Sequence, residues 1–303
     1  MTESSRRFAF PLWLMKWKDN PSNSTGTLSV LRFWGSFMFK PSAAAAACVL
    51  SLFAVGNAHA EGWFSGDWYL KLGGAGFTAP KYQGDNKNEF GFSPIISLGR
   101  QGQGARFTSR NDSASISLLD NGPISMGLAG KLVSPRDEGD SADLKGMTRI
   151  KRGGELGGFA EAYPTDWLRV RGEVRQGIRS HSGVVGDVAV DAFTDIAPGI
   201  QISAGPRATW VSSKYNERYY GVSAAQTAAG APSPYSPGGG LHSAGIGAAI
   251  TWKVTENAEV GSFAEYRRLT GDAADSSLVR ERGSKNQFII GVQASYKFNF
   301  SLP

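Results

Sequence analysis

Apolar and polar residues alternate along most of this chain with a period of two. The pattern is clearest in residues 244–254 and 286–298, where every second residue is apolar and most of the residues between are small or polar. A period of two indicates a β-strand whose two faces meet different environments. By this criterion the sequence predicts twelve strands, at about 68–76, 90–99, 105–110, 113–120, 124–133, 154–163, 168–177, 183–195, 200–211, 242–254, 258–269 and 286–298.

The connections between these predicted strands alternate in length. Short connections, which hold turn residues such as Asp, Asn, Gly and Pro, fall at about 100–104, 121–123, 164–167, 196–199 and 255–257, and longer ones at about 77–89, 134–153, 212–241 and 270–285. Two brief connections, near 111–112 and 178–182, break the alternation. Short turns on one edge and long loops on the other are typical of an outer-membrane barrel. The sequence therefore predicts an all-β, up-and-down antiparallel transmembrane β-barrel of about twelve strands, with both chain ends at the periplasmic, short-turn edge.

One face of the predicted strands is too polar for a dry protein core. In residues 168–176, Leu168, Val170 and Val174 share one face, while the other carries Arg169, Arg171, Glu173 and Arg175. Unpaired charges are costly in a dry core, and a wet lumen removes that cost. We therefore expect the apolar face to meet outer-membrane lipid and these four charged residues to face the lumen.

The charged face has two interpretations. Arg169, Arg171 and Arg175 could form a ladder that attracts anions, as rings of basic residues do in pores. They could instead form a salt-bridge network that fills the lumen together with glutamates on neighbouring strands. Those glutamates are Glu155, Glu161, Glu173, Glu259 and Glu265. The sequence leaves both arrangements open.

The N-terminal region predicts export. Met38–Lys40 is a short basic start, Ala43–Val55 is an apolar run, and Ala58-His59-Ala60 has the small-x-small pattern of a signal peptidase site. We expect residues 38–60 to be a signal peptide cleaved after Ala60 and residues 61–303 to form the barrel. Residues 1–37 are an unexplained leader, which a translation start at Met38 would leave out.

Composition narrows the function classes. The chain has 303 residues and a formal net charge of +6, of which residues 1–60 carry +4. The basic sequence pI of 9.4 is thus partly a property of the export segment, and we expect no nucleic-acid partner. Mean hydropathy is −0.24, and no run of roughly 20 apolar residues predicts a membrane-spanning helix. The one cysteine, Cys48, lies inside the signal run, so we expect neither a disulfide nor a thiolate metal site in the mature chain.

The sequence carries no motif for catalysis. The histidines beyond the signal peptide, His181 and His242, are predicted on or beside outer loops, without a nucleophile elbow, an H-E-x-x-H pair or a phosphate loop. Asp272, Asp275 and Ser276 lack the ligand series of a calcium loop, so we expect them to shape the loop through backbone hydrogen bonds. The prediction is a protein that is not an enzyme and binds no cofactor or metal.

Several segments between 68 and 298 resemble one known family. Residues 219–226 read YYGVSAAQ, residues 269–277 read LTGDAADSS before GSKNQ at 283–287, and residues 79–84 read APKYQG. They resemble loop segments of the MipA/OmpV family of outer-membrane proteins. The positions that carry the resemblance, and are the candidate family residues, are Tyr219, Tyr220, Gly221, Gln226, Gly271, Asp272, Asp275, Gly283, Asn286 and Gln287.

The resemblance implies a scaffold that interacts with a murein lytic transglycosylase and holds it together with a murein synthase at the outer membrane. A porin-like channel for small solutes stays open as an alternative, with loop 212–241 folded inward as a constriction. In a third alternative that loop stays outside as an adhesive or antigenic surface.

The C-terminus predicts a signal for the barrel assembly machinery. Tyr296, Phe298 and Phe300 are its candidate aromatics. The family usually stops at the position of Phe298, but here residues 299–303 follow, so either Phe298 or Phe300 could be the closing aromatic.

Overall fold

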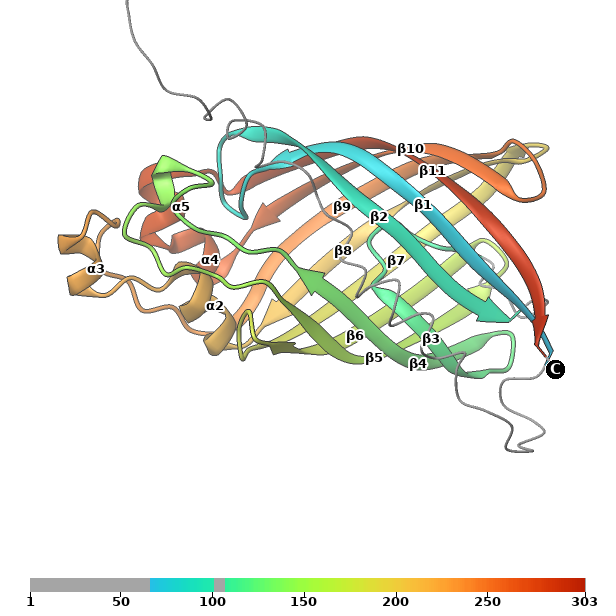
Figure 1. Ribbon diagram of the computed structural model, residues 1–303, viewed down its shortest axis with the longest axis horizontal. Helices are drawn as coiled ribbons and strands as arrows, with labels where there is room; N and C mark the ends of the chain where they lie inside the picture. The colour runs from blue at the N-terminus through green and yellow to red at the C-terminus, as the bar shows by residue number, and fades with distance from the viewer. Residues whose placement is uncertain (1–65, 101–106, 303) are drawn as a thin grey trace, which may run out of the picture. The chain divides into compact units, whose positions relative to one another are not determined.

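The computed structural model describes residues 66–100 and 107–302, and the predicted leader and signal peptide lie outside them. The described part is dominated by eleven strands in one sheet, with neighbours in the order β2-β1-β11-β10-β9-β8-β7-β6-β5-β4-β3. Each strand pairs antiparallel with its neighbours, and the sheet curls into an incomplete barrel whose end strands are β2 and β3 (Figure 1). The predicted all-β antiparallel fold is confirmed. The strands are β1 (Gly66–Pro80), β2 (Asn88–Arg100), β3 (Ala114–Asp120), β4 (Ile124–Val133), β5 (Gly153–Thr165), β6 (Leu168–Ile178), β7 (Val184–Ala197), β8 (Ile200–Val211), β9 (Gly240–Lys253), β10 (Ala258–Leu269) and β11 (Asn286–Leu302).

The predicted strand at 105–110 is wrong for its described part. Residues 107–110 belong to no strand, and residues 107–113 run inside the barrel instead. Alternation alone misled here because side chains on both sides of this segment find partners in the interior. Phe107 stacks on Phe193 with ring centroids 4.7 Å apart, and Asp112 pairs with Arg169 at 2.7 Å.

This inward turn removes one of the twelve predicted strands, so that eleven remain in the described part of the chain. β2 ends at the short-turn edge, where Arg100 lies opposite Trp68. β3 begins part-way along β4, where Ala114 lies opposite Gly130, and runs toward the same edge. β2 and β3 therefore run in the same direction. The first and last described residues share the short-turn edge, because Gly66 of β1 lies opposite Leu302 of β11.

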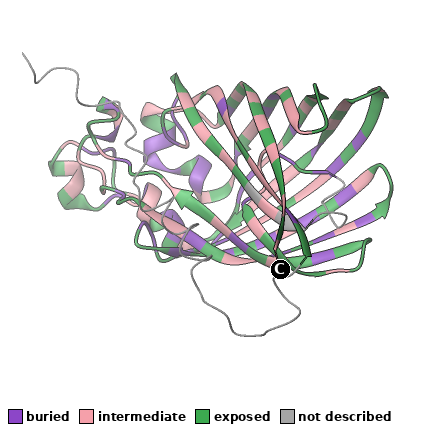
Figure 2. Ribbon diagram, turned by 45° about the vertical axis from the view of Figure 1, so that its right-hand side comes forward, coloured by how far each residue is buried: buried purple, intermediate pink, exposed green. Residues whose placement is uncertain are grey.

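The outer face of the sheet is an apolar band. On β11, Phe288, Ile290 and Val292 are 59%, 61% and 63% exposed, whereas Gln287 is 5% exposed. Figure 2 shows the same alternation between exposed and less exposed residues along other strands. A band of this kind is what a barrel presents to lipid. None of the helices in the described ranges is both long and apolar enough to cross a membrane.

Helices gather at one end of the barrel, away from the C-terminus (Figure 1). The longer connections supply them, and together they form what we call the cap. Its apolar core holds Tyr82, Leu144, Tyr220, Leu269, Ala273, Ala274, Leu278 and Val279 from four of these connections and one strand end. The helical elements are η1 (Ala142–Leu144), α2 (Ser213–Tyr220), α3 (Ala224–Ala228), α4 (Gly271–Asp275) and α5 (Ser277–Arg282). The long loops are thus a packed unit with its own core.

The last strand continues past the predicted closing aromatic. β11 reaches Leu302, so residues 299–302 extend the strand. Tyr296 and Phe298 are exposed on its outer face, with ring centroids 4.8 Å apart, and Phe300 is half-buried. The strand register therefore runs unbroken through both candidate aromatics.

Candidate functional site

The interior of the barrel holds a network of ion pairs centred on Arg169 of β6. This guanidinium, 1% exposed, donates two hydrogen bonds to the carboxylate of Asp112, at 2.7 and 2.9 Å. It donates a third to Asp191 of β7 at 2.7 Å, and that carboxylate also accepts from Arg207 of β8 at 2.9 Å. Charged hydrogen bonds of this kind offset the cost of removing a cation from water.

The other candidate residues of β6 extend the same network. Arg171 pairs with Glu161 at 2.9 Å and with Glu173 at 2.8 Å. Arg175 pairs with Glu155 at 2.9 Å and Asp187 at 2.5 Å, and it also contacts Glu173. These contacts are those of a salt-bridge network and differ from a ladder of unpaired cations. Of the remaining glutamates, Glu265 pairs with Arg267, and Glu259 pairs with Lys71 at 2.5 Å.

Residues 107–113 cross this interior from wall to wall. On one side Arg110 lies over the rings of Phe77 in β1 and Phe263 in β10, 4.7 and 4.1 Å from their centroids. On the other side Asp112 holds Arg169, and the backbone N–H of Ser113 donates to Glu173 at 3.2 Å. Asn111 donates to Glu265, Arg207 donates to Ser109, and Tyr163 donates to the carbonyl of Phe107. We call residues 107–113 the inner segment.

Sequence reasoning missed some members of the network. Asp187 and Asp191 lie two positions either side of Ala189 on the inward face of a predicted strand, so the period of two was a signal that could have found them. Asp112 offered no such signal, because the sequence placed it in a brief connection between two predicted strands. Its role depends on the inner segment turning into the barrel.

The family segment at residues 219–226 lies in the cap. Tyr219 and Tyr220 end α2, and Gly221 follows as its C-cap residue. The guanidinium of Arg136 lies 5.3 Å from the ring centroid of Tyr219 and 5.9 Å from that of Tyr82, and it donates to the Tyr219 carbonyl at 2.8 Å. Burial lowers the pKa of Arg136 and raises that of Tyr219 to about 12. The motif thus encloses a buried cation, which the tyrosine rings stabilise through cation–π contacts.

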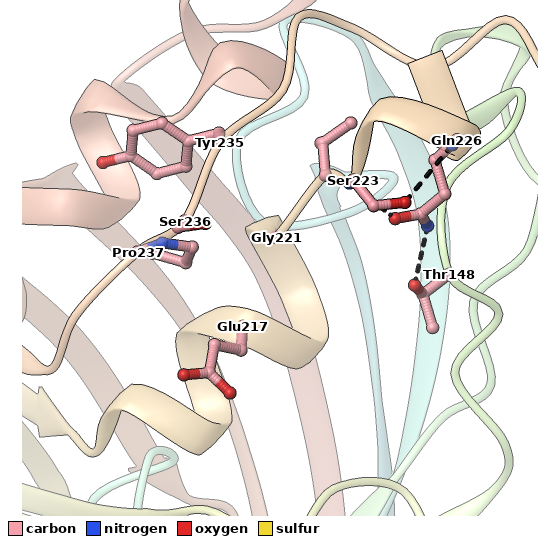
Figure 3. A pocket seen from close by; sticks show the side chains of 9 residues that line it. Thr148, Glu217, Gly221, Ser223, Gln226, Tyr235, Ser236 and Pro237 are labelled. Carbon is pink, nitrogen blue, oxygen red and sulfur yellow. Dashed lines mark hydrogen bonds between the residues drawn. The ribbon is translucent and has the colours of Figure 1, made fainter. Parts of the chain in front are cut away.

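The same motif lines a pocket at the surface of the cap (Figure 3). Gln226 and Ser223 form a capping box at the start of α3, and the Gln226 amide also donates to Thr148 at 2.9 Å. The pocket, of about 210 Å³, lies between this helix and the end of α2. It is lined by Thr148, Glu217, Gly221, Val222, Ser223, Gln226, Tyr235, Ser236 and Pro237.

The family segment at residues 283–287 fastens the cap to the strands. Gln287 is buried at the start of β11, where it accepts from the N–H of Gly84 at 3.0 Å and donates to the carbonyl of Asp85 at 3.2 Å. A Cβ at Gly283 would lie 2.0 Å from the Gly84 carbonyl oxygen, so this close approach requires glycine. Asn286 accepts from Tyr266 at 2.8 Å and from Arg268 at 3.0 Å.

The remaining motif residues shape α4. Gly271 begins this helix with φ +50°, and Asp272 accepts from the backbone N–H of Gly238 in another long connection. The Asp272 side chain therefore links two loops and goes beyond the local backbone contact we expected. Asp275 is exposed and pairs with Lys285 at 3.4 Å. Among residues 66–100 and 107–302, no group of three or more His, Cys, Asp or Glu side chains has a metal-binding arrangement.

The two histidines lie where the barrel meets the cap. His181, in the connection after β6, is buried with its Nε2 3.1 Å from Glu155. His242, in β9, is buried against the rings of Tyr215 and Tyr220. The aromatic residues of α2 thus separate the two imidazoles.

Comparison with known proteins gives one family. The model of the family described as MltA-interacting protein MipA matches residues 72–298, about three quarters of the chain. No curated protein matches the chain. Among solved structures, the chain is similar to the COG4313 outer membrane channel from Pseudomonas putida F1, with TM-score 0.41, 9% identity, and 80% of this chain and 100% of that one covered. It is also similar to the outer membrane channel DcaP of Acinetobacter baumannii, with TM-score 0.37, 8% identity, and 78% and 99% covered.

The Asp112–Arg169 pair can be tested through stability. Asp112→Ala leaves the buried guanidinium without its bidentate partner, and we expect the free energy of unfolding to fall by about 3 kcal/mol. The measurement is urea unfolding of residues 61–303 in detergent. Asp195→Ala is the control, because Asp195 is exposed and its side chain accepts, among the described residues, from Gln201 alone, so a change below about 0.5 kcal/mol is expected. Equal losses in both variants would contradict the assigned role.

The buried carboxyl of Asp85 predicts a pH dependence of the cap. Burial raises its pKa, so the folded state holds this proton more tightly than the unfolded state does. The resulting stability is present at low pH and is lost as pH rises through the raised pKa. We expect Asp85→Asn to protect the cap from protease more than the native residue at pH 7.5, and the difference to shrink toward pH 4. Asp275→Asn, at an exposed position, should show no such trend. A variant less resistant than the native protein at pH 7.5 would mean that a charged acceptor for the Lys87 N–H, at 2.8 Å, contributes more than burial of the charge costs.

Proposed function

The chain belongs to the MltA-interacting protein MipA family, and from that premise we propose that it is a scaffold for a murein lytic transglycosylase. The protein is an outer-membrane barrel. The proposal rests on one observation, the family match over residues 72–298. The partner named by the family is the one we assign to this chain, with a murein synthase as a second partner in the same assembly. No catalytic step is assigned to the barrel itself.

The filled interior supports an anchor over a channel. The inner segment contacts both walls, and the guanidinium groups of Arg169, Arg171 and Arg175 all have carboxylate partners. A path for solutes would require the inner segment to leave these partners. It would also require the cap, with its own apolar core, to move from the other end. A barrel filled in this way suits a protein whose part is to hold others in place.

The partner surface follows from the orientation of the barrel. Short turns face the periplasm and long loops face outward in barrels of this type. The family motif residues are occupied in the cap at the long-loop end, fastening Arg136, Gly84 and Gly238. We therefore assign the partner to the short-turn edge, at residues 121–123, 166–167, 198–199 and 254–257. Trp167 and Glu256 are exposed there.

Direct binding tests the scaffold. Residues 61–303, immobilised in detergent, should retain the purified soluble domain of a lytic transglycosylase. Trp167→Ser combined with Glu256→Ser should weaken retention at least tenfold, since both side chains lie on the assigned surface. Gln226→Ala, in the cap pocket, is the matched control and should bind as the native chain does. The assignment fails if the native chain retains no transglycosylase at saturating concentration, or if only the cap variant loses it.

Conductance in planar bilayers tests the channel alternative. We expect no discrete conductance steps from the folded native chain at high protein load, because the inner segment occupies the barrel and the cap lies at its long-loop end. Folding is checked on protein recovered from the vesicles that form the bilayer. A folded barrel should change its electrophoretic migration when it is heated. Regular steps from correctly folded protein would favour the porin-like alternative.

A further inference from the structure

Four exposed cations lie together at the long-loop edge. They are Lys151 and Arg152 just before β5, Arg179 just after β6, and Lys214 in α2 just after β8. Within the described part of the chain, none of the four forms an ion pair. This distinguishes them from Lys87 and Lys285, which pair with Asp143 and Asp275. We call these four residues the cationic patch.

The hydrogen bonds of Arg218 bring together the segments that carry the patch. Arg218 of α2 donates to the carbonyl of Ser180 at 3.3 Å and to that of Arg149 at 2.7 Å. These carbonyls belong to the connections that carry Arg179 on one side and Lys151 and Arg152 on the other. β5 and β6 are also paired at this edge, where Gly154 lies opposite Ile178. Three segments far apart in sequence therefore meet at the place where they carry these cations.

The patch lies directly beyond the apolar band. On the strands that lead to it, Leu156, Ile178, Val184 and Trp210 are 57%, 53%, 40% and 45% exposed. Side chains with this exposure face the hydrocarbon region, and a tryptophan at the end of the band is typical of the membrane interface. The cations consequently lie at the level of the lipid headgroups in the outer leaflet.

Arg179 occupies a backbone conformation that suits glycine. It has φ +72°, and among the described residues no other non-glycine residue has a positive φ. This region is unfavourable for a residue with a Cβ, and glycine adopts it freely. The guanidinium is exposed and without an ion pair within residues 66–100 and 107–302, so no contact inside the fold accounts for the charge at this position.

We propose that the cationic patch binds the phosphate groups of phosphorylated glycolipids in the outer leaflet. Four neighbouring cations repel one another, and a phosphate dianion relieves that repulsion. Guanidinium groups bind phosphate with two parallel hydrogen bonds, and ammonium groups bind it as point charges. The ligand is a lipid headgroup because the patch adjoins the apolar band, so one molecule contacts both through its phosphates and its acyl chains.

Neighbouring carboxylates do not cancel this charge. Asp137 pairs at 3.3 Å with Arg149, a residue that lies next to the patch. Glu217, three residues after Lys214, lines the cap pocket, and within the described residues it forms no ion pair with Lys214. The patch is therefore available to an anion from outside the protein.

The test measures binding of a phosphorylated glycolipid to residues 61–303 in an uncharged detergent, by native mass spectrometry and by the shift in thermal midpoint. The patch variant combines Lys151→Gln, Arg152→Gln, Arg179→Gly and Lys214→Gln. With about a fivefold loss for each cation at a membrane surface, we expect affinity to fall at least a hundredfold. The charge-matched control combines Lys81→Gln, Lys87→Gln, Lys285→Gln and Lys253→Gln. Three of these lysines already have carboxylate partners, and Lys253 lies at the opposite edge, so a change of less than about threefold is expected.

Two further arms separate the possible outcomes. Arg179→Gly alone should leave the thermal midpoint without lipid unchanged or raised, because glycine relieves the positive φ, while it lowers glycolipid affinity about fivefold. A dephosphorylated glycolipid should bind the native chain as weakly as the phosphorylated lipid binds the patch variant. Equal losses in the patch and control variants would overturn the proposal. So would displacement of the lipid by an equal concentration of inorganic phosphate, which would indicate a site for free anions.

Discussion

The structure depends on pairing the charges that the inward face of β6 brings into the barrel. Arg169 is almost fully buried, and its guanidinium is held by Asp112 and Asp191. An unpaired cation in this position would be strongly destabilising, since burial removes its hydration and nothing would replace it. Asp191 comes from the neighbouring strand, but Asp112 reaches Arg169 only because the inner segment turns into the barrel. The requirement for a second carboxylate is therefore linked to the path of residues 107–113.

That path explains why the barrel has an odd strand count among its described residues. If residues 107–113 had formed part of the barrel wall, Arg110 and Asp112 would have lain near strand ends and faced the same side of the sheet. As an inner segment, the same residues contact β1 and β10 on one side and β6 on the other. The result is an interior occupied by protein, with β2 and β3 running in the same direction at the ends of the sheet. A filled interior of this kind is consistent with a barrel that serves as an anchor.

The two edges of the barrel have different chemistry. At the long-loop edge the family motif residues are engaged in holding the cap: Gln287 fixes the β1–β2 connection, and the α2 tyrosines enclose Arg136. In this chain the motif residues therefore hold the cap together, and the partner proposed for the short-turn edge would contact other residues. The same edge carries the cationic patch, assembled by Arg218 from three segments. The short-turn edge is built from tight turns and the paired ends of β1 and β11.

The sequence by itself determined the strands, the loop pattern and the apolar outer face. β4, β8 and β10 have the same bounds that alternation predicts, because a strand between lipid and a polar interior must change polarity at every residue. The motif segments also indicated the family correctly. Only the tertiary structure decided where residues 107–113 run, how Arg169 is paired and which cations gather in the patch. Period two reports which face of a strand a residue occupies, and it carries no information about contacts across the lumen or between loops. Those contacts depend on how strands distant in sequence are placed in space.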